Sequence, residues 1–436
     1  MALRTFLFTQ GLASPFMHSL ARLLRAEGHH ALRINLSGAD LAVWPERATN
    51  FRGSAAQWPD FIADFLRERQ VTDLIVFGDC RPYHVVAIDA ARRLGIATHV
   101  FEEGYIRPNW ITLEATGTNG YSGIPRDPDR IRELARRFAE PTPPVPIRGS
   151  LVNRAIWDIA ANLIGVALWP MFPHYRWHGT DHPILEYLGW LKRFATAPAR
   201  RKRTRHAIRS VVEGGLPYYL MPLQLHSDYQ IRVHSPYQHP IEAAGEIVGS
   251  FALRAPADAH LVFKLHPLDN HLFDYHGALE RIAAREGVTG RLHIIDDGDL
   301  AILLKRSRGI VLVNSSIATL ALAYGCAVKA LGTATYDMPG LTYQGALDDF
   351  WTARMEPDAE LYRAYCRVVI AFTQINGGFF SADAIEIGTR LAKDRILTGS
   401  ARLLTAAAPR SRVVKTPRGA RVRATSRRRP SIVPGE

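Results

Sequence analysis

The chain has 436 residues, of which 47% are hydrophobic and 22% are charged. At about 150 residues per domain this length allows two or three domains, and the composition excludes a disordered or fibrous protein. The three cysteines, Cys80, Cys326 and Cys366, are too few for a disulfide framework and match no zinc-binding spacing, which fits a reducing cytosol.

The net charge of +13 is concentrated at one end of the chain. Residues 401–436 contain ten Lys or Arg and one acidic residue, so they carry +9 and the preceding 400 residues carry only +4. The nearly neutral body contains no module that reads bases, so we expect no nucleic acid partner. Residues 397–436 contain few apolar residues, which predicts a disordered basic tail that anionic lipid would attract.

Short apolar runs alternate with helical stretches over residues 1–125. The runs at residues 5–9, 31–36, 73–77 and 98–101 are continuous, which is typical of strands buried on both faces. The first run leads through a glycine turn into an amphipathic helix, so it predicts the start of a βαβ unit rather than a secretory signal. We expect an N-terminal Rossmann-like domain of a cytoplasmic protein.

Residues 126–210 differ in character and are predicted to be a linker. They contain a proline-rich stretch, an apolar segment at residues 155–172 and a basic cluster at residues 200–203. The apolar segment is near the lower length limit for crossing a bilayer, and Asp158 and Pro170 interrupt it, which disfavours a span. A packed interdomain helix and a helix lying in the membrane interface both remain open. Tryptophans beside arginines suit an interface, and we expect a protein peripheral to the inner membrane.

A second α/β series covers residues 211–396. Apolar runs predict strands at residues 218–220, 261–265, 292–295, 309–313 and 328–331, with helices between them. The fold class is therefore α/β, with two doubly wound Rossmann-like domains facing a cleft. Ligands bind at the carboxyl ends of the strands in such sheets, so we expect the site in this cleft.

Three carboxylates follow two predicted strands of the first half. Asp79 closes one strand, with Arg81 behind it, and Glu102 and Glu103 close the next, with Arg107 behind them. Buried like charges raise the pKa of one member, which leaves a neutral acid beside an ionised partner. Glycosyl transfer needs such pairs. The alternative is that these acids cap helices and pair with the two arginines.

Polar residues also end strands of the second half. Lys264 and His266 lie two residues apart and therefore on one face of a strand, where both can donate to a phosphate; the alternative is a strand end closed by Pro267. Asn314, Ser315 and Ser316 stand between a strand and a helix, which favours an anion cradle and ordinary capping equally. Gln224 and Asp228 lie in a loop, where they can bind a sugar or base or form an Asx turn.

These strings together resemble one family. Glu102-Glu103-Gly104 followed by Tyr105-Ile106-Arg107-Pro108, with Gln224, Asp228, His266-Pro267 and Asn314-Ser315-Ser316, is similar to the capsule polysaccharide biosynthesis/export proteins. Within them it resembles the transferases that prime the capsular lipid anchor with 3-deoxy-manno-octulosonic acid (Kdo). The resemblance covers about residues 3–332.

The resemblance implies a GT-B-like fold, a CMP-Kdo donor, a phosphatidylglycerol-type lipid acceptor and retention of the β configuration, without a metal or cofactor. It implies that Asp79 is the nucleophile and that Glu102 or Glu103 is the acid/base. The other implied roles are nucleotide-sugar binding by Gln224, Asp228, Lys264, His266, Pro267, Asn314, Ser315 and Ser316, and acceptor binding by Arg81 and Arg107. Two alternatives stay open: an inverting CMP-sialic-acid transferase, and a non-catalytic component of capsule export that binds the polymer.

Overall fold

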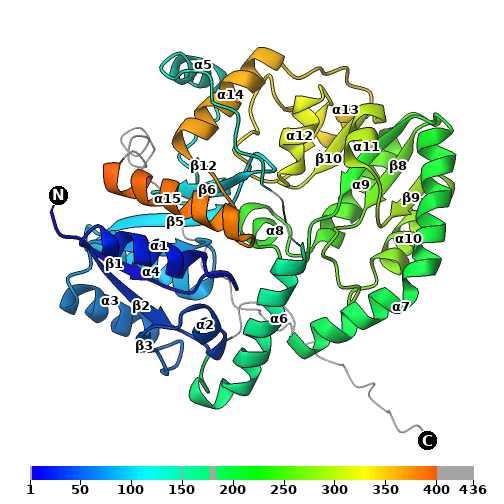
Figure 1. The fold of residues 1–436 in the computed structure, drawn as a ribbon. Helices are drawn as coiled ribbons and strands as arrows, with labels where there is room; N and C mark the ends of the chain where they lie inside the picture. The colour runs from blue at the N-terminus through cyan, green and yellow to red at the C-terminus, as the bar shows by residue number, and fades with distance from the viewer. Residues whose placement is uncertain (1, 148, 150, 177–182, 400–436) are drawn as a thin grey trace, which may run out of the picture.

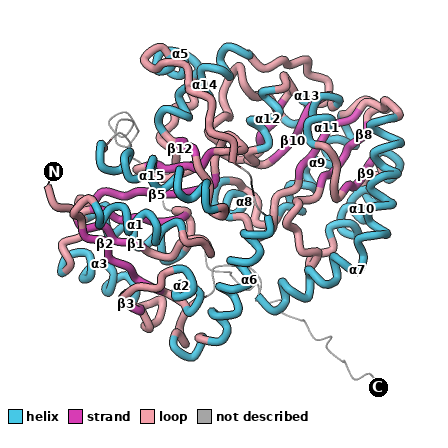
Figure 2. The backbone as a smooth tube through the Cα atoms, in the orientation of Figure 1, coloured by secondary structure: helices cyan, strands magenta, loops and turns pink. Residues whose placement is uncertain are grey.

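The computed structural model describes residues 2–147, 149, 151–176 and 183–399. Two α/β units lie side by side, and a long helix runs between them (Figure 1). The strands form two separate groups with helices packed around each (Figure 2). The predicted α/β class with two Rossmann-like units in a GT-B-like arrangement is therefore confirmed.

The first unit contains a seven-stranded sheet in the order β12-β6-β5-β4-β1-β2-β3. Strands β1 to β5 run parallel to their neighbours, whereas β6 is antiparallel to both β5 and β12. The strands are β1 (Thr5–Phe8), β2 (His30–Asn35), β3 (Thr49–Asn50), β4 (Asp73–Phe77), β5 (Ala97–Glu103), β6 (Trp110–Glu114) and β12 (Gln374–Asn376).

Both faces of this sheet are covered, which explains the continuous apolar runs. Along β4, Leu74 and Val76 point into one core cluster, and Ile75 and Phe77 point into the other. The covering helices are α1 (Phe16–Ala26), α2 (Gly38–Val43), α3 (Trp58–Glu68), α4 (Pro82–Arg93) and α15 (Ala382–Thr398).

The second unit contains a five-stranded, fully parallel sheet in the order β11-β10-β7-β8-β9. Its strands, each of which was predicted to within two residues, are β7 (Tyr218–Pro222), β8 (His260–Lys264), β9 (Leu292–Ile295), β10 (Gly309–Leu312) and β11 (Val328–Ala330). The helices around it are α5 (Pro128–Ala135), α8 (Tyr229–His234), α9 (Pro240–Arg254), α10 (Tyr275–Arg285), α11 (Leu300–Arg306), α12 (Ile317–Ala323), α13 (Leu347–Phe350) and α14 (Ala359–Phe372).

The end of the second unit differs from its predicted boundary. Residues 211–396 were expected to form one domain, but β12 pairs with β6, and α15 packs against α1 on the first sheet. The chain therefore returns to the first unit after α14. The predicted first domain of residues 1–125 is correspondingly incomplete, because its sheet ends in a strand from the far end of the chain.

The connection between the units contains α6 (Leu151–Ala167), the short helix η2 (Trp169–Met171), α7 (Pro183–Ala207) and η3 (Ile208–Glu213). α6 begins close to the junction of the two units and packs against α2, and α7 runs along the second unit (Figure 1). Among the described residues, no helix is both long and apolar enough to cross a bilayer. Most of the predicted tail, residues 400–436, lies outside the described part of the chain.

Candidate active site

Two neighbouring strand ends bring the acids of the first unit together. β4 and β5 are parallel with Phe77 opposite Phe101, so Asp79 and Glu102 follow at the same edge of the sheet. Gly78, at φ +71°, turns the chain directly after β4, a conformation that favours glycine. Asp79 and Glu102 therefore lie at the same edge of the sheet, and their joint role in catalysis stays a prediction.

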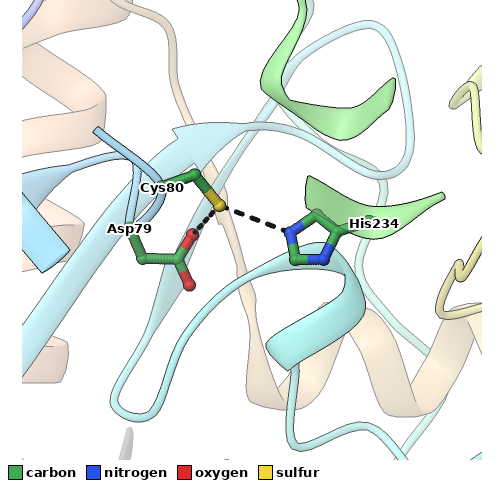
Figure 3. Close-up of side chains that lie close together, drawn as sticks. All are labelled: Asp79, Cys80 and His234. Carbon is green, nitrogen blue, oxygen red and sulfur yellow. Dashed lines mark hydrogen bonds between the residues drawn. The ribbon is translucent and has the colours of Figure 1, made fainter. Parts of the chain in front are cut away.

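The Asp79 carboxylate is buried and held from several sides. It accepts hydrogen bonds from the Thr118 backbone N–H at 2.9 Å and from the Thr118 hydroxyl at 3.3 Å. The Cys80 thiol donates to it at 3.3 Å, and the same sulfur lies 3.4 Å from Nε2 of His234 (Figure 3). Because His234 ends α8 of the second unit, this cluster joins the two units at the carboxylate.

The same cluster contains ligand types that suit a metal ion. Single ligand atoms of Asp79, Cys80 and His234 lie within 4.8 Å of one another. Carboxylate, thiolate and imidazole are the ligands that zinc prefers. The Thr118 donors already engage both oxygens of the carboxylate, so the geometry also has a metal-free explanation. The absence of a metal in the working protein stays a prediction.

Glu102 has an unusual protonation equilibrium. Burial raises its pKa to about 7, and the nearby charges of Glu103 and Asp79 add to the rise. The Glu103 backbone N–H, which donates at 3.0 Å, and the charge of Arg81 oppose the rise. A carboxyl group with a pKa near 7 can both hold and release a proton at neutral pH.

Glu103 points to the other face of β5, because neighbouring side chains of a strand alternate. Its Oε1 lies 3.6 Å from the guanidinium of Arg154, which belongs to the first turn of α6. The Arg154 guanidinium also lies 5.0 Å from the ring centroid of Phe380. The structure therefore separates the two adjacent acids, placing Glu102 beside Asp79 and Glu103 beside the connecting helix.

Glu114 is a buried acid that the sequence analysis missed. It accepts hydrogen bonds at 2.6 Å from the Tyr105 and Ser122 hydroxyls. Burial raises its pKa to about 7, with a small contribution from the charge of Asp79. It ends β6, a strand that was not predicted. The available signal was an acid directly after Ile111-Thr112-Leu113, as Glu102 directly follows Val100 and Phe101.

His266 of the second unit is a neutral hydrogen-bond donor. The Leu268 backbone N–H donates to Nδ1 at 3.0 Å, so the ring proton of the neutral form lies on Nε2. Burial lowers the pKa of His266 to about 4, and the positive charges of Arg107, Lys264 and Arg154 lower it further. The expectation that this histidine donates fits the geometry, but at neutral pH its positive charge is absent and must come from the arginines.

Lys264 is buried in the second unit. Burial lowers its pKa, and the nearby carboxylates of Asp297 and Asp296 oppose that shift. Pro267 is exposed directly after His266.

Gln224, Asp228 and Asn314 form one hydrogen-bonded network. The Gln224 side-chain amide donates at 3.1 Å to Asp228 and at 3.1 Å to Asn314. Asp228 accepts from the Gln230 backbone N–H at 2.9 Å and caps α8, the helix that carries His234. Of the two interpretations of Asp228, the structure shows the Asx-type cap. This network holds together the loops after β7 and β10 and the start of α8.

The two serines after β10 have separate surroundings. Ser315 accepts a hydrogen bond from the Ile317 backbone N–H at 3.3 Å, a local turn contact, and the N-cap residue Ser316 makes no side-chain capping bond. Ser316 lines a pocket between the units, together with Tyr105, Asn119, Thr319 and Tyr336. The Thr319 hydroxyl closes one side of this pocket by donating to the Tyr105 carbonyl at 3.0 Å. Anion binding by the serines stays a prediction.

The two predicted acceptor-binding arginines occupy different places. Arg81 is half-buried, donates to the Gly11 carbonyl at 3.0 Å, and its charge acts on Glu102. Arg107 is exposed, and its charge acts on His266 and Asp228 of the second unit. Arg107 therefore connects the two sides of the cleft, whereas Arg81 supports the acids of one side.

Comparison with known proteins identifies the family. Residues 72–380 match the family model described as capsule polysaccharide biosynthesis protein. The capsule polysaccharide export protein KpsS of Escherichia coli is 32% identical over 383 residues, which cover 86% of this chain and 97% of KpsS. The capsule polysaccharide modification protein LipB of Neisseria meningitidis serogroup A is 31% identical over 391 residues, covering 86% of this chain and 91% of LipB.

Among solved structures, the β-Kdo 2,7 transferase of Thermosulfurimonas dismutans KpsC aligns with a TM-score of 0.44 and 12% identity, covering 91% of this chain and 99% of that chain. The family match and the two curated relatives confirm the predicted resemblance. The chain belongs to the capsule polysaccharide biosynthesis family.

Proposed function

We propose that this member of the capsule polysaccharide biosynthesis family is a glycosyltransferase that moves Kdo from CMP-Kdo to a phosphatidylglycerol-type lipid with retention of the β configuration. The observation that carries the proposal is the junction of the two units. Asp79 and Glu102 of the first unit stand at the ends of neighbouring strands, and Cys80 beside Asp79 contacts His234 of the second unit. The neutral His266 of the second unit lies within reach of the charges of Arg107 and Arg154.

In the first step an oxygen of Asp79 attacks the anomeric carbon of Kdo. The bond from that carbon to the phosphate oxygen breaks, and CMP leaves with the electron pair. The Nε2–H of His266 and the charge of Arg107 stabilise the departing phosphate. The two Thr118 donors fix the orientation of the attacking carboxylate. No metal or cofactor takes part.

In the second step a hydroxyl of the acceptor attacks the same carbon from the opposite side. The bond to Asp79 breaks, and the hydroxyl proton passes to Glu102, whose pKa of about 7 suits this task. Two inversions give net retention. Arg154, beside Glu103, lies where it can bind the phosphate of an anionic acceptor.

The proposal places the enzyme at the cytoplasmic face of the inner membrane, where a soluble CMP-sugar and a membrane lipid meet. Contact with other capsule assembly proteins belongs to the same proposal. The names of the two curated relatives, for capsule export and for capsule modification, support this setting.

The direct test is incubation of the purified protein with CMP-Kdo and a phosphatidylglycerol analogue. We expect CMP release and a lipid product whose anomeric configuration is β by NMR. Folded protein that forms neither product contradicts the proposal. A product of inverted configuration, or activity with CMP-sialic acid alone, selects the sialyltransferase alternative.

A trapped intermediate provides a second test. In the Glu102→Gln variant the second step slows, so intact-protein mass spectrometry should detect one Kdo residue bound to the chain, and peptide mapping should place it on Asp79. A Glu68→Gln variant, which changes an exposed acid of α3, is the matched control.

A non-catalytic role in capsule export is the second candidate, and the name of the relative KpsS favours it. It predicts that Asp79→Asn and His266→Ala leave capsule assembly intact in cells. Loss of the capsule with both variants, at normal protein levels, excludes this role.

A further inference from the structure

The outward face of α6 is apolar. Val152, Ile156, Ile159, Leu163 and Val166 follow one another at intervals of four and three residues, so they form one stripe along the helix. Their exposed fractions lie between 43% and 68%. The opposite face packs on α2, where Gly165 contacts Ala39 and Leu168 contacts Gly38. The stripe is therefore the solvent-exposed face of a helix whose opposite face packs against α2.

The apolar surface continues beyond α6. Trp169 and Met171 of η2 are exposed, and so are Leu185, Leu188, Leu191 and Phe194 of α7. Burial raises the pKa of Tyr187 in α7, and Asp158 of α6 adds to the rise, so the two helices are neighbours here. Residues 152–194 contain twelve of the 23 exposed large hydrophobic side chains in the described part of the chain. Such a concentration marks an interaction surface.

The charge beside this surface is positive. Eight Lys or Arg and no acidic residue lie between Glu186 and Glu213. Lys202 and Arg205 follow Leu191 by eleven and fourteen residues, which puts them on the same face of α7 as Leu188 and Leu191. Both are exposed. An apolar stripe that ends in cations matches the arrangement of acyl chains and anionic headgroups in a bilayer surface.

The helix also leads to the candidate active site. Its first turn carries Arg154, which lies 3.6 Å from Glu103 and lowers the pKa of His266 behind the larger effect of burial. The stripe begins two residues earlier, at Val152. A helix that lies flat in the interface therefore keeps Arg154 close to the level of the headgroups.

We propose that the outward face of α6, η2 and the first half of α7, continued by Lys202 and Arg205, docks the protein on a bilayer that contains anionic lipid, and that Arg154 receives the acceptor headgroup directly from that surface. The docking stands on the surface alone, and the delivery of the acceptor rests on the proposed function. Figure 1 shows α6 and the start of α7 along one margin of the molecule, below the junction of the two units.

The test is flotation of the full-length protein with phosphatidylcholine vesicles and with vesicles that also contain phosphatidylglycerol, at low and high salt. We expect binding to the anionic vesicles and at least a tenfold loss in the Ile156→Glu/Leu163→Glu variant. Lys202→Glu/Arg205→Glu should lose the dependence on phosphatidylglycerol and on salt. The matched control, Leu253→Glu/Ile302→Glu, changes exposed apolar residues of α9 and α11 and should bind like the wild type.

Several outcomes overturn the docking. One is equal vesicle binding by the wild type and the Ile156→Glu/Leu163→Glu variant, and another is absence of binding by the wild type, which leaves the surface to a protein partner. A dimer that only this variant dissociates, with vesicle binding unchanged, assigns the surface to a second copy. If deletion of residues 400–436 alone abolishes vesicle binding, the tail and not this surface binds the membrane. Ile156→Ser/Leu163→Ser replaces the glutamate variant if circular dichroism shows that the latter is unfolded.

Activity separates this proposal from the proposed function. The Ile156→Glu/Leu163→Glu variant should transfer Kdo to soluble glycerol phosphate at the wild-type rate. Its rate with the lipid in vesicles should fall at least tenfold, whereas Arg154→Ala should lower the rate with both acceptors. Equal transfer to vesicle lipid by the Ile156→Glu/Leu163→Glu variant and the wild type contradicts the delivery role. If no variant and no acceptor gives transfer, the proposed function fails while the flotation result still decides the docking.

Discussion

The two sides of the cleft use burial in opposite ways. In the first unit burial keeps protons on Glu102 and Glu114, raising the pKa of each to about 7. In the second unit burial keeps a proton off His266, lowering its pKa to about 4. The result is one side with acids poised to exchange protons and one side with fixed, uncharged donors. In the proposed function, proton transfer therefore belongs to the first unit and phosphate binding to the second.

The strongest test of this division of roles between the two units is the Asp79→Asn substitution in the first unit. An amide cannot form the bond to the anomeric carbon, so we expect kcat to fall by about 10³-fold or more. The measurement is CMP release from CMP-Kdo with the lipid acceptor. Activity within tenfold of the wild type shows that another group is the nucleophile. Glu68→Gln is the control for a general effect of losing an acid.

On the second side, His266→Ala should lower kcat by about 10²-fold, because one donor to the departing phosphate is lost. His266→Gln retains a side-chain N–H and should recover part of the rate. This pattern distinguishes a donor from a purely structural histidine. If both variants have the same rate as the wild type, phosphate binding does not depend on this residue.

The pH dependence of kcat should report the protonation of Glu102 in the first unit. In the proposed mechanism Glu102 must be ionised to take up the acceptor proton, so kcat should rise as the pH passes through about 7 and then level off. In Glu102→Gln the remaining activity should lose this limb. If kcat of the variant still rises as the pH passes through 7, a different group titrates there, and Glu114 is the next candidate.

Glu114 should affect stability more than rate. Its folded-state pKa, about 7, is above the ordinary value, so between about pH 4.5 and 7 the folded protein binds more protons than the unfolded chain. The stabilisation that comes from this protonated carboxyl group is complete below pH 4.5 and is lost as the pH rises to 7. The wild type should therefore lose more thermal stability than Glu114→Gln between pH 5 and 8. A calorimetric series that shows parallel curves contradicts the shifted pKa.

Cys80→Ser should have the smallest effect. The thiol lies between Asp79 and His234, and a hydroxyl reaches less far, so the contact between the units weakens by about 1 kcal/mol. We expect a two- to fivefold lower rate and a slightly lower melting temperature. A much larger loss, together with zinc binding by the wild type in a calorimetric titration, would instead indicate a metal at this cluster.

The sequence predicted the parallel strands well because both of their faces are buried. β4, β7 and β10 are buried along their whole length and almost entirely apolar, and such runs carry a clear signal. β6 was missed because the polar Thr112 interrupts its apolar residues. β12 was missed because it has only three residues and pairs with a partner 262 residues away. Distant pairing leaves no local pattern, so the return of the chain to the first unit could not be predicted.

The candidate site was predictable where it depends on strand ends. Asp79 and Glu102 follow neighbouring parallel strands, which fixes their proximity from the order of the strands. The contact of Cys80 with His234 depends on how the two units close against each other, and no residue pattern records that. Arg154 was missed for the same reason, since only the path of the connection brings it to Glu103.

The return of the chain has a consequence for synthesis on the ribosome. Until β12 emerges, β6 is an open edge, and the surface later covered by α15 leaves Phe16 and Ile111 without their apolar partners. An unpaired edge and an uncovered apolar face invite aggregation. The half that is translated first is therefore the half that is completed last, and a nascent chain stalled before residue 374 should depend on chaperones.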